Sequence, residues 1–371
     1  MAEVRRVLFV ADSYAPRVGG AERLLQTFLA RLRASDVDAW IAVPAGAVQR
    51  RRAGDEVILA PARATPLGWW VSPSWWRREI DRVRPQIIQT SGPSFVEWSL
   101  LAAEMAARSR RPRISLYHCH LDLTRPVSRV ATRMHTRLVL PRFDAVVTTA
   151  PAVVDDLRGW GIGAELILPG LLEAVPRSFP STRGREILFV GRLPARYTQK
   201  RPDLLIEAFG MLRKEVPDAT LHFVGGGPGV HTLALLARRL GVERHIIFHG
   251  ELRGEALEAR YRDAACLVLP SPSRSEGFSL VLIEALARGC PVVLSRGVGS
   301  APFLEPLECA TLFEPNDRRS LAEAIGSVLL RDERIAEGSF RLVCEQLLAR
   351  RMVDQFLALW SSRLDGSMAR R

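Results

Sequence analysis

The chain has 371 residues, of which 47% are hydrophobic and 25% are charged, and its formal net charge is +12. This balance excludes a disordered or membrane-spanning protein and predicts a globular one with two domains of about 150–200 residues each. The positive charge favours acidic partners such as phosphates or a membrane surface, whereas no nucleic-acid-binding module is visible.

The first half of the chain alternates strand-like and helix-like segments. Residues 7–11 predict a buried strand, because this apolar run is too short for a secretory signal, and residues 21–33 predict an amphipathic helix. Short apolar strands alternating with helices are typical of parallel sheets that are covered on both faces. Further strands of this kind are expected at 39–43, 86–89, 113–118 and 145–150.

The second half repeats the pattern and predicts a second doubly wound domain. The segment 169–185 is rich in Pro, Gly and Ser and lacks periodicity, which is typical of a domain boundary. We therefore expect an N-terminal domain over 1–172 and a C-terminal domain over 173–349, with a helix at 350–364 that packs back on the first. Strands are expected at 186–191, 220–225, 245–250, 266–270 and 291–295, and helices at 203–215 and 231–241.

Glycine-rich motifs follow two of the predicted strands. Ligands of open parallel sheets bind where strands end and loops lead into helices. Gly19 and Gly20 lie at such a place, although an ordinary turn explains them equally well, and they do not form the dinucleotide fingerprint G-x-G-x-x-G. Gly226, within the glycines of 225–229, allows close approach of a ligand or simply forms a turn.

Charged and titratable residues follow other strands. His118 and His120 lie after the strand at 113–118, and of the two we favour His118 as the functional residue over a structural one. Arg192 and Lys200 are candidates for binding a diphosphate, as a planar fork and as a point charge respectively. Lys200 is one of only two lysines among 52 basic residues, which favours a specific use over an ordinary surface position.

Two glutamates stand out in the segment SEGFSLVLIEALARGCPVV, residues 275–293. Glu276 precedes a helix that we predict to begin near Ser279, whose free amides suit a diphosphate. Glu284 lies within the apolar helix, where hydrogen bonds from a ribose diol would compensate for burying its charge. A capping or salt-bridged pair of glutamates is the alternative.

This segment resembles the E-x7-E signature of retaining glycosyltransferases of family 4, which have the two-domain GT-B fold. The segments PRVGGAERLLQ, SLYHCH, FVGRL, KRPDLLIEAF, FVGGGPG and FLALW occur in the family's order, so the resemblance covers nearly the whole chain. It implies a nucleotide-sugar donor held mainly by the C-terminal domain and an acceptor held mainly by the N-terminal domain. It also implies that neither a metal nor another cofactor is needed.

The resemblance further implies residue roles. Glu284 would bind the ribose hydroxyls, Glu276 would lie beside the donor sugar, and His118 would lie near the reacting face of that sugar. The implied catalytic set is His118, Glu276, Arg192 and Lys200. The implied donor-binding set is Gly19, Gly20, Arg192, Lys200, Gly226, Glu276, Gly277, Phe278, Ser279 and Glu284.

The function expected from this resemblance is hexosyl transfer with retained anomeric configuration, to a lipid-linked or polysaccharide acceptor in glycan or cell-envelope biosynthesis. Two alternatives stay open: a catalytically silent GT-B partner subunit that binds nucleotide sugar, and a sugar-nucleotide epimerase. The five cysteines show no paired spacing, which favours a cytoplasmic location.

The segment 67–84 concentrates tryptophan and arginine. One interpretation is a loop and helix packed on the N-terminal sheet, with the indole rings in the core. The other is a patch that binds an anionic membrane surface, such as the inner face of the cell membrane, because tryptophan favours the bilayer interface and arginine favours anionic lipid. The residues of that patch would be Trp69, Trp70, Trp75, Trp76, Arg77 and Arg78.

Overall fold

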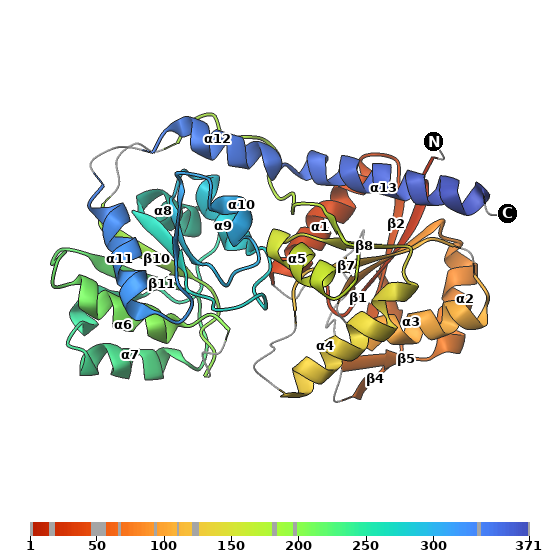
Figure 1. The fold of residues 1–371 in the computed structure, drawn as a ribbon, viewed down its shortest axis with the longest axis horizontal. Helices are drawn as coiled ribbons and strands as arrows, with labels where there is room; N and C mark the ends of the chain where they lie inside the picture. The colour runs from red at the N-terminus through yellow and green to blue at the C-terminus, as the bar shows by residue number, and fades with distance from the viewer. Residues whose placement is uncertain are drawn as a thin grey trace. The chain divides into compact units, whose positions relative to one another are not determined.

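The computed structural model divides the chain into two compact units (Figure 1). Met1–Glu173 together with Leu347–Arg371 form one unit, here the N-terminal domain, and Ala174–Gln346 form the other, the C-terminal domain. The change of unit after Glu173 lies within the segment 169–185. The structure describes residues 3–14, 19–45, 57–65, 68–92, 95–109, 111–120, 126–179, 184–195, 199–331 and 335–369.

The N-terminal domain contains a seven-stranded parallel sheet in the order β3-β2-β1-β6-β7-β8-β9. Its strands are β1 (Arg6–Ala11), β2 (Asp38–Pro44), β3 (Val57–Ala60), β6 (Ile87–Gly92), β7 (Arg113–Tyr117), β8 (Ala145–Thr148) and β9 (Glu165–Leu166). A separate antiparallel ribbon pairs β4 (Ala62–Thr65) with β5 (Gly68–Val71).

Alternate side chains of β1 supply two different cores, as the pleat of a strand requires. Leu8 belongs to a cluster with Trp76 on one face of the sheet. On the other face, the ring of Phe9 lies 5.4 Å from that of Phe28 and 6.0 Å from that of Trp360. The helices of this domain are α1 (Gly20–Arg33), α2 (Pro73–Val83), α3 (Phe95–Ala106), α4 (Pro126–Leu138), α5 (Pro151–Gly159) and α13 (Ala349–Ala369).

The C-terminal domain contains a six-stranded parallel sheet in the order β12-β11-β10-β13-β14-β15. Its strands are β10 (Glu186–Val190), β11 (Thr220–Val224), β12 (Ile246–Phe248), β13 (Cys266–Leu269), β14 (Val292–Ser295) and β15 (Ala310–Phe313). Its helices are α6 (Pro202–Leu212), α7 (Val230–Arg239), α8 (Glu255–Asp263), α9 (Leu280–Leu286), α10 (Ala301–Leu304), α11 (Arg318–Leu329) and α12 (Glu337–Gln346).

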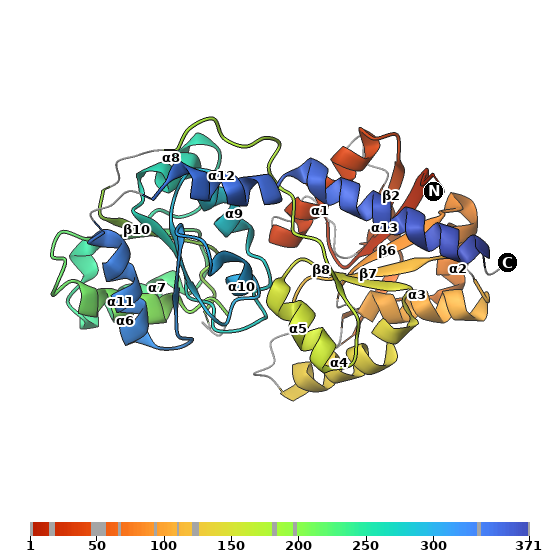
Figure 2. The same cartoon turned by 45° about the horizontal axis from the view of Figure 1, so that its top comes forward.

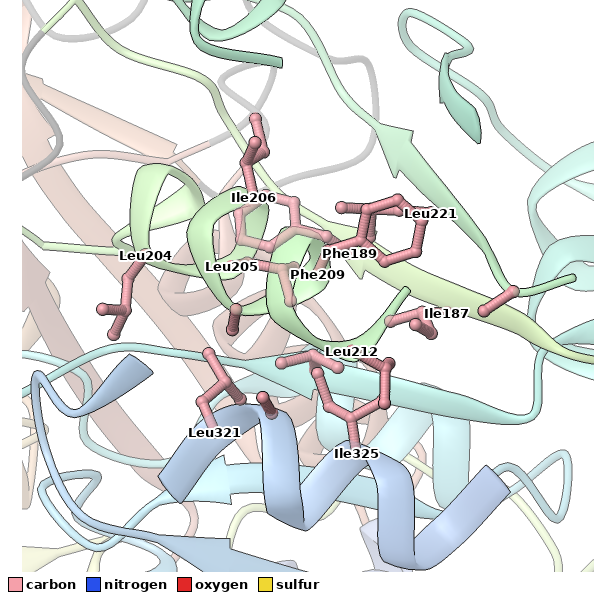
Figure 3. Packing of buried hydrophobic residues seen from close by; sticks show 14 of the residues in the cluster. Ile187, Phe189, Leu204, Leu205, Ile206, Phe209, Leu212, Leu221, Leu321 and Ile325 are labelled. Carbon is pink, nitrogen blue, oxygen red and sulfur yellow. The ribbon is translucent and has the colours of Figure 1, made fainter. Parts of the chain in front are cut away.

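One face of this sheet carries a continuous apolar core (Figure 3). Ile187 and Phe189 of β10 meet Phe209 of α6, and Leu321 and Ile325 of α11 close the cluster from the side. All five side chains are fully buried, so the cluster holds two helices firmly against the strand. Because the core fixes both β10 and α6, it also fixes where the chain leaves the strand and where it enters the helix.

The predicted fold class is confirmed: both domains are α/β with parallel sheets. The predicted strands and helices are present with ends shifted by a few residues, and α13 packs on α1 of the N-terminal domain. Four strand pairings were not anticipated, namely β3 on β2, β9 on β8, β15 on β14 and the β4–β5 ribbon. Among the described residues no helix is long and apolar enough to cross a membrane.

Candidate active site

Lys200 and Glu276 form an ion pair in the C-terminal domain. Lys200 Nζ lies 2.7 Å from Glu276 Oε2, and the two side chains are 20% and 12% exposed. Lys200 lies after β10 and just before α6, whereas Glu276 lies between β13 and α9. Since β10 and β13 are parallel neighbours in the sheet, their loops emerge at the same edge and bring together residues that are distant in sequence.

The carboxyl of Glu276 is held in its charged form. Burial raises its pKa, but the Lys200 ammonium, a hydrogen bond from Ser279 and the Arg192 guanidinium together hold the pKa below the ordinary value of 4.5. Arg192 is exposed at the end of β10. Three predicted site residues therefore interact with the carboxylate of a fourth, Glu276. The two positive charges, of Lys200 and Arg192, outnumber the one negative charge of Glu276.

The three residues after Glu276 are held by the surrounding loops. Gly277 and Ser279 are buried, and Ser279 is the residue from which α9 begins. The ring of Phe278 lies 6.0 Å from that of Phe303 in α10. Gly299 N donates a 2.9 Å hydrogen bond to Glu276 O, so a second loop fixes the backbone of this segment.

Glu284 meets a tyrosine. Tyr261 of α8 donates a 2.6 Å hydrogen bond from its hydroxyl to Glu284 Oε2, and both side chains are buried. Burial and the negative charge of Glu284 raise the pKa of Tyr261 well above its ordinary value, so the hydroxyl stays protonated and can donate. Arg288 lies over the ring of Tyr261, 5.7 Å from its centroid, and forms a 2.9 Å ion pair with Glu258.

Tyr261 was not predicted as a site residue. A lone aromatic residue in the charged helix EALEARYRD was the only signal in the sequence, and its contact with Glu284 depends on how α8 packs against α9. This hydrogen bond offsets part of the free energy that it costs to bury a carboxylate in an apolar helix.

The glycines after β11 serve the packing of the loop itself. Gly225 and Gly227 have positive φ angles of 125° and 145°, and a Cβ on them would lie 2.0 Å from Gly191 O and 2.2 Å from Leu193 O. Leu193 N donates a 2.9 Å hydrogen bond to Gly226 O. The loop therefore lies directly along residues 191–193, which carry Arg192, and it needs glycine for that contact.

His118 lies at the carboxyl end of β7 in the N-terminal domain. Its Nε2 lies 2.8 Å from Ser91 Oγ, and its backbone N donates to Gly92 O at the end of the neighbouring strand β6. Burial lowers the pKa of His118 to about 4, although the charges of Glu97 and Glu22 act in the opposite direction. The imidazole is therefore neutral at physiological pH.

Gly19 and Gly20 begin α1, beside an acidic side chain. Gly19 is the residue before the helix and is extended, and Gly20 is exposed. The side chain of Glu22 lies over this turn: a Cβ on Gly19 would lie only 2.2 Å from Glu22 Oε2. Ser13 Oγ holds the carboxylate there by donating a 2.6 Å hydrogen bond to Glu22 Oε1. The favourable place for an anion at this helix start is thus taken by a side chain of the helix itself.

His120 belongs to a different environment from His118. It is buried between β7 and α5, with Nδ1 3.0 Å from Tyr117 Oη and Nε2 2.9 Å from Asp156 Oδ2. The ring of Trp160 lies 4.8 Å away. These contacts fix α5 on the sheet, which is a structural use of the histidine.

The tryptophan-rich segment is only partly available as a surface. Trp76 cannot belong to a membrane patch, because it is fully buried and donates a 2.9 Å hydrogen bond from Nε1 to Ser99 Oγ. Trp69 and Trp75 pack against the same core with part of their surface. Arg77 and Arg78 are exposed. For Trp69, Trp75 and Trp76, core packing accounts for the indole rings better than a membrane patch does.

The chain has two α/β domains with parallel sheets, and polar residues lie at the carboxyl ends of the strands in both, as in GT-B proteins. Residues 18–171 match the model of the family described as Glycosyltransferase Family 4, and residues 174–337 match that of Glycosyl transferases group 1. The chain belongs to the family 4 glycosyltransferases and is a glycosyltransferase with the GT-B fold.

Two curated relatives carry the same name. A GDP-mannose-dependent alpha-(1-6)-phosphatidylinositol monomannoside mannosyltransferase of Mycobacterium tuberculosis is 26% identical over 374 residues, which cover 90% of this chain and 92% of that protein. The protein of the same name in Mycolicibacterium smegmatis is 34% identical over 143 residues, only 37% of each chain.

A solved structure shows the same fold. Anabaena Alr3699/HepE in complex with UDP superposes with a TM-score of 0.72 and 18% identity over 96% of this chain and all of that one (100%). At this identity the likeness supports the two-domain architecture alone.

Proposed function

We propose that the protein transfers a hexosyl group from a nucleoside-diphosphate sugar to a lipid-linked or polysaccharide acceptor, with retained anomeric configuration, in glycan or cell-envelope biosynthesis. The observation that carries this proposal is the group of Lys200, Arg192 and Ser279 around the charged carboxylate of Glu276. A site with more positive than negative charge at the edge of a parallel sheet suits a diphosphate.

In this proposal Lys200 exchanges partners when the donor binds. In the structure its ammonium is paired with Glu276, and a diphosphate offers it a second anion of higher charge. As the bond between the anomeric carbon and the phosphate oxygen breaks, negative charge grows on the leaving diphosphate. Lys200 and Arg192 then stabilise the transition state more than the ground state.

The retained configuration follows from a same-face route. The acceptor oxygen bonds to the anomeric carbon on the face that the diphosphate leaves, and the acceptor proton passes to the leaving phosphate oxygen. The route needs no second carboxylate about 5 Å from Glu276, as a double-displacement hydrolase would. His118, as a neutral imidazole, can hydrogen-bond a sugar hydroxyl without adding charge.

We assign the remaining contacts to the donor nucleotide. Glu284 accepts hydrogen bonds from the ribose diol, with Tyr261 holding the carboxylate in place. The backbone of residues 277–279 and of Gly226 lines the diphosphate side. We assign Gly19 and Gly20 to the donor as well, for which Glu22 has to leave the start of α1. The site cations Arg192 and Lys200 supply the positive charge that a metal ion would otherwise supply, so we propose a reaction without a metal.

Relatives that act on a phosphatidylinositol mannoside support a lipid-linked acceptor for this chain. We accordingly propose that the protein works in the cytoplasm at the inner face of the cell membrane. Of the region 69–78, only the exposed part, including Arg77 and Arg78, remains available for such a surface.

Two measurements test the proposal. Nucleoside-diphosphate sugars should raise the melting temperature of the full chain when screened one by one, and at least one of them should be transferred or hydrolysed. The anomeric configuration of the product, read by NMR, should match that of the donor. Inversion, or the absence of any stabilising donor, contradicts the proposal.

A further inference from the structure

The helix α4 exposes a stripe of large apolar side chains. Val130, Met134 and Leu138 keep 59%, 45% and 44% of their exposure. They are spaced by four residues, so they follow one another along a single side of the helix. Three of the twelve large apolar residues that are exposed in the described part of the chain therefore lie on this one helix.

A basic stripe runs beside the apolar one. Each residue of the apolar stripe is directly preceded in the sequence by an exposed arginine, namely Arg129, Arg133 and Arg137. The helix PVSRVATRMHTRL contains no acidic residue. Among the described residues none of these three arginines has a carboxylate partner, in contrast to many arginines elsewhere in the chain.

The opposite side of α4 is anchored in the N-terminal domain. Thr132, His135 and Thr136 are buried, and His135 Nε2 lies 3.1 Å from Glu97 Oε2 of α3. The inward side of the helix is therefore fixed by packing and by a buried polar contact. Figures 1 and 2 both draw α4 at the margin of this domain, away from α13.

An exposed stripe of this composition suits one environment in particular. The interface of a bilayer accepts apolar side chains among its acyl chains while its head groups accept guanidinium groups. A second copy of the chain docked face to face is disfavoured, because a two-fold contact would bring like-charged stripes of arginine together. The net charge of +12 favours an anionic surface over a neutral one.

We propose that the outer face of α4, formed by Arg129, Val130, Arg133, Met134, Arg137 and Leu138, binds the surface of an anionic lipid bilayer. The helix lies in the plane of the interface, with Val130, Met134 and Leu138 inserted among the acyl chains. This inference deepens the proposed function and rests on it, because a membrane-bound enzyme would meet a lipid-linked acceptor at the bilayer. The surface differs from the tryptophan-rich segment, where Trp76 is fully buried and Trp69 and Trp75 pack against the core.

Sedimentation of the full chain with vesicles tests the proposal. The protein should pellet with vesicles of phosphatidylcholine and phosphatidylglycerol at low salt, less at high salt, and hardly with phosphatidylcholine alone. Replacing the three arginines by glutamine should lower the partition coefficient on the order of 100-fold, since each arginine near anionic lipid contributes about fivefold. Replacing the three apolar residues by glutamine should lower it by roughly tenfold or more.

The matched control is the double variant Arg350→Gln and Arg351→Gln, which removes exposed arginines from α13 of the same domain. It should pellet nearly as well as the wild type. The proposal is overturned if the wild type stays in the supernatant, or if the α4 variants pellet like the control. It is also overturned if light scattering shows a wild-type dimer that the α4 variants dissociate, because the face is then a protein interface.

Binding of donor nucleotide in solution keeps this test separate from the proposed function. Variants of α4 should bind nucleotide like the wild type, which shows that they are folded. A chain that binds vesicles through α4 but binds no nucleotide sugar would defeat the transferase proposal and leave the membrane surface standing. A chain with the opposite behaviour would defeat the membrane surface alone.

Discussion

The two domains place polar groups at the same edge of their sheets but control charge in different ways. In the C-terminal domain, Glu276 is charged and Lys200 is its partner. In the N-terminal domain, burial holds His118 neutral beside the hydroxyl of Ser91. The first arrangement can exchange one ionic partner for another, whereas the second offers hydrogen bonds without charge.

This difference indicates that the two domains bind different chemical groups. An ion pair that is partly exposed can open for a polyanion, because the anion replaces one carboxylate as partner of the ammonium. A neutral imidazole suits a sugar or an acceptor hydroxyl, since it neither repels nor traps charge near the reacting carbon. Variants of each domain test this difference.

The largest effect is expected for Lys200→Ala. Turnover should fall on the order of 10²–10³-fold, because the leaving diphosphate loses a cation in the transition state. KM for the donor should change much less. The control is Lys214→Ala, which removes the only other lysine from an exposed position and should leave both constants unchanged. A change in KM alone would assign Lys200 to ground-state binding.

His118→Ala is expected to lower turnover about 10²-fold with the domain still folded. His120→Ala should leave turnover nearly unchanged and instead lower the free energy of unfolding by about 1–3 kcal/mol, because it removes the hydrogen bonds to Tyr117 and Asp156. Steady-state kinetics and denaturant unfolding separate the two outcomes. The reverse pattern would transfer the catalytic assignment to His120.

Glu284→Ala should weaken donor-nucleotide binding by roughly tenfold, because ribose hydroxyls lose their acceptor in a buried site. Calorimetric titration of wild type and variant with the nucleotide measures this. Tyr261→Phe serves as the comparison: it removes one hydrogen bond to Glu284 and keeps the carboxylate, so its effect on affinity should be smaller. Equal affinity of Glu284→Ala and wild type would sink the ribose assignment.

The smallest effect concerns the titration of His118. Its ring should titrate near pH 4 in NMR spectra rather than near the ordinary 6.5. Between these values the unfolded chain binds a proton that the native chain does not, so stability should fall as the pH is lowered from about 6.5 towards 4. The His118→Gln variant should lose this part of the dependence. A ring that titrates at 6.5 would contradict the neutral site.

Most of the fold could be predicted because strands that are buried on both faces of a sheet appear in the sequence as short apolar runs. The strands at Arg6–Ala11 and Glu186–Val190 are continuous apolar runs, and both were predicted within a residue or two. The strand β3 (Val57–Ala60) and the β4–β5 ribbon were missed, because β3, β4 and β5 follow one another with no helix between them and so lack the alternation that marked the other strands.

The candidate site was predicted where motifs fix it and missed where packing fixes it. Glu276 and Lys200 could be found because each follows a strand, and neighbouring parallel strands place their loops together. Tyr261 could not, because its contact with Glu284 depends on the packing of α8 on α9. Composition alone also left Trp76 open between core and surface, since a group of four tryptophans does not say which ring points inward.

The order of the domains along the chain bears on how the protein is made. Leu171 and Leu172 donate to Leu347 O, and Ala349 donates to Leu172 O, so the chain leaves the N-terminal domain and re-enters it at one place. A ribosome has therefore finished the whole C-terminal domain before it makes α13. Until Trp360 emerges, Phe9 lacks one of its aromatic neighbours, and the domain that was begun first is completed last.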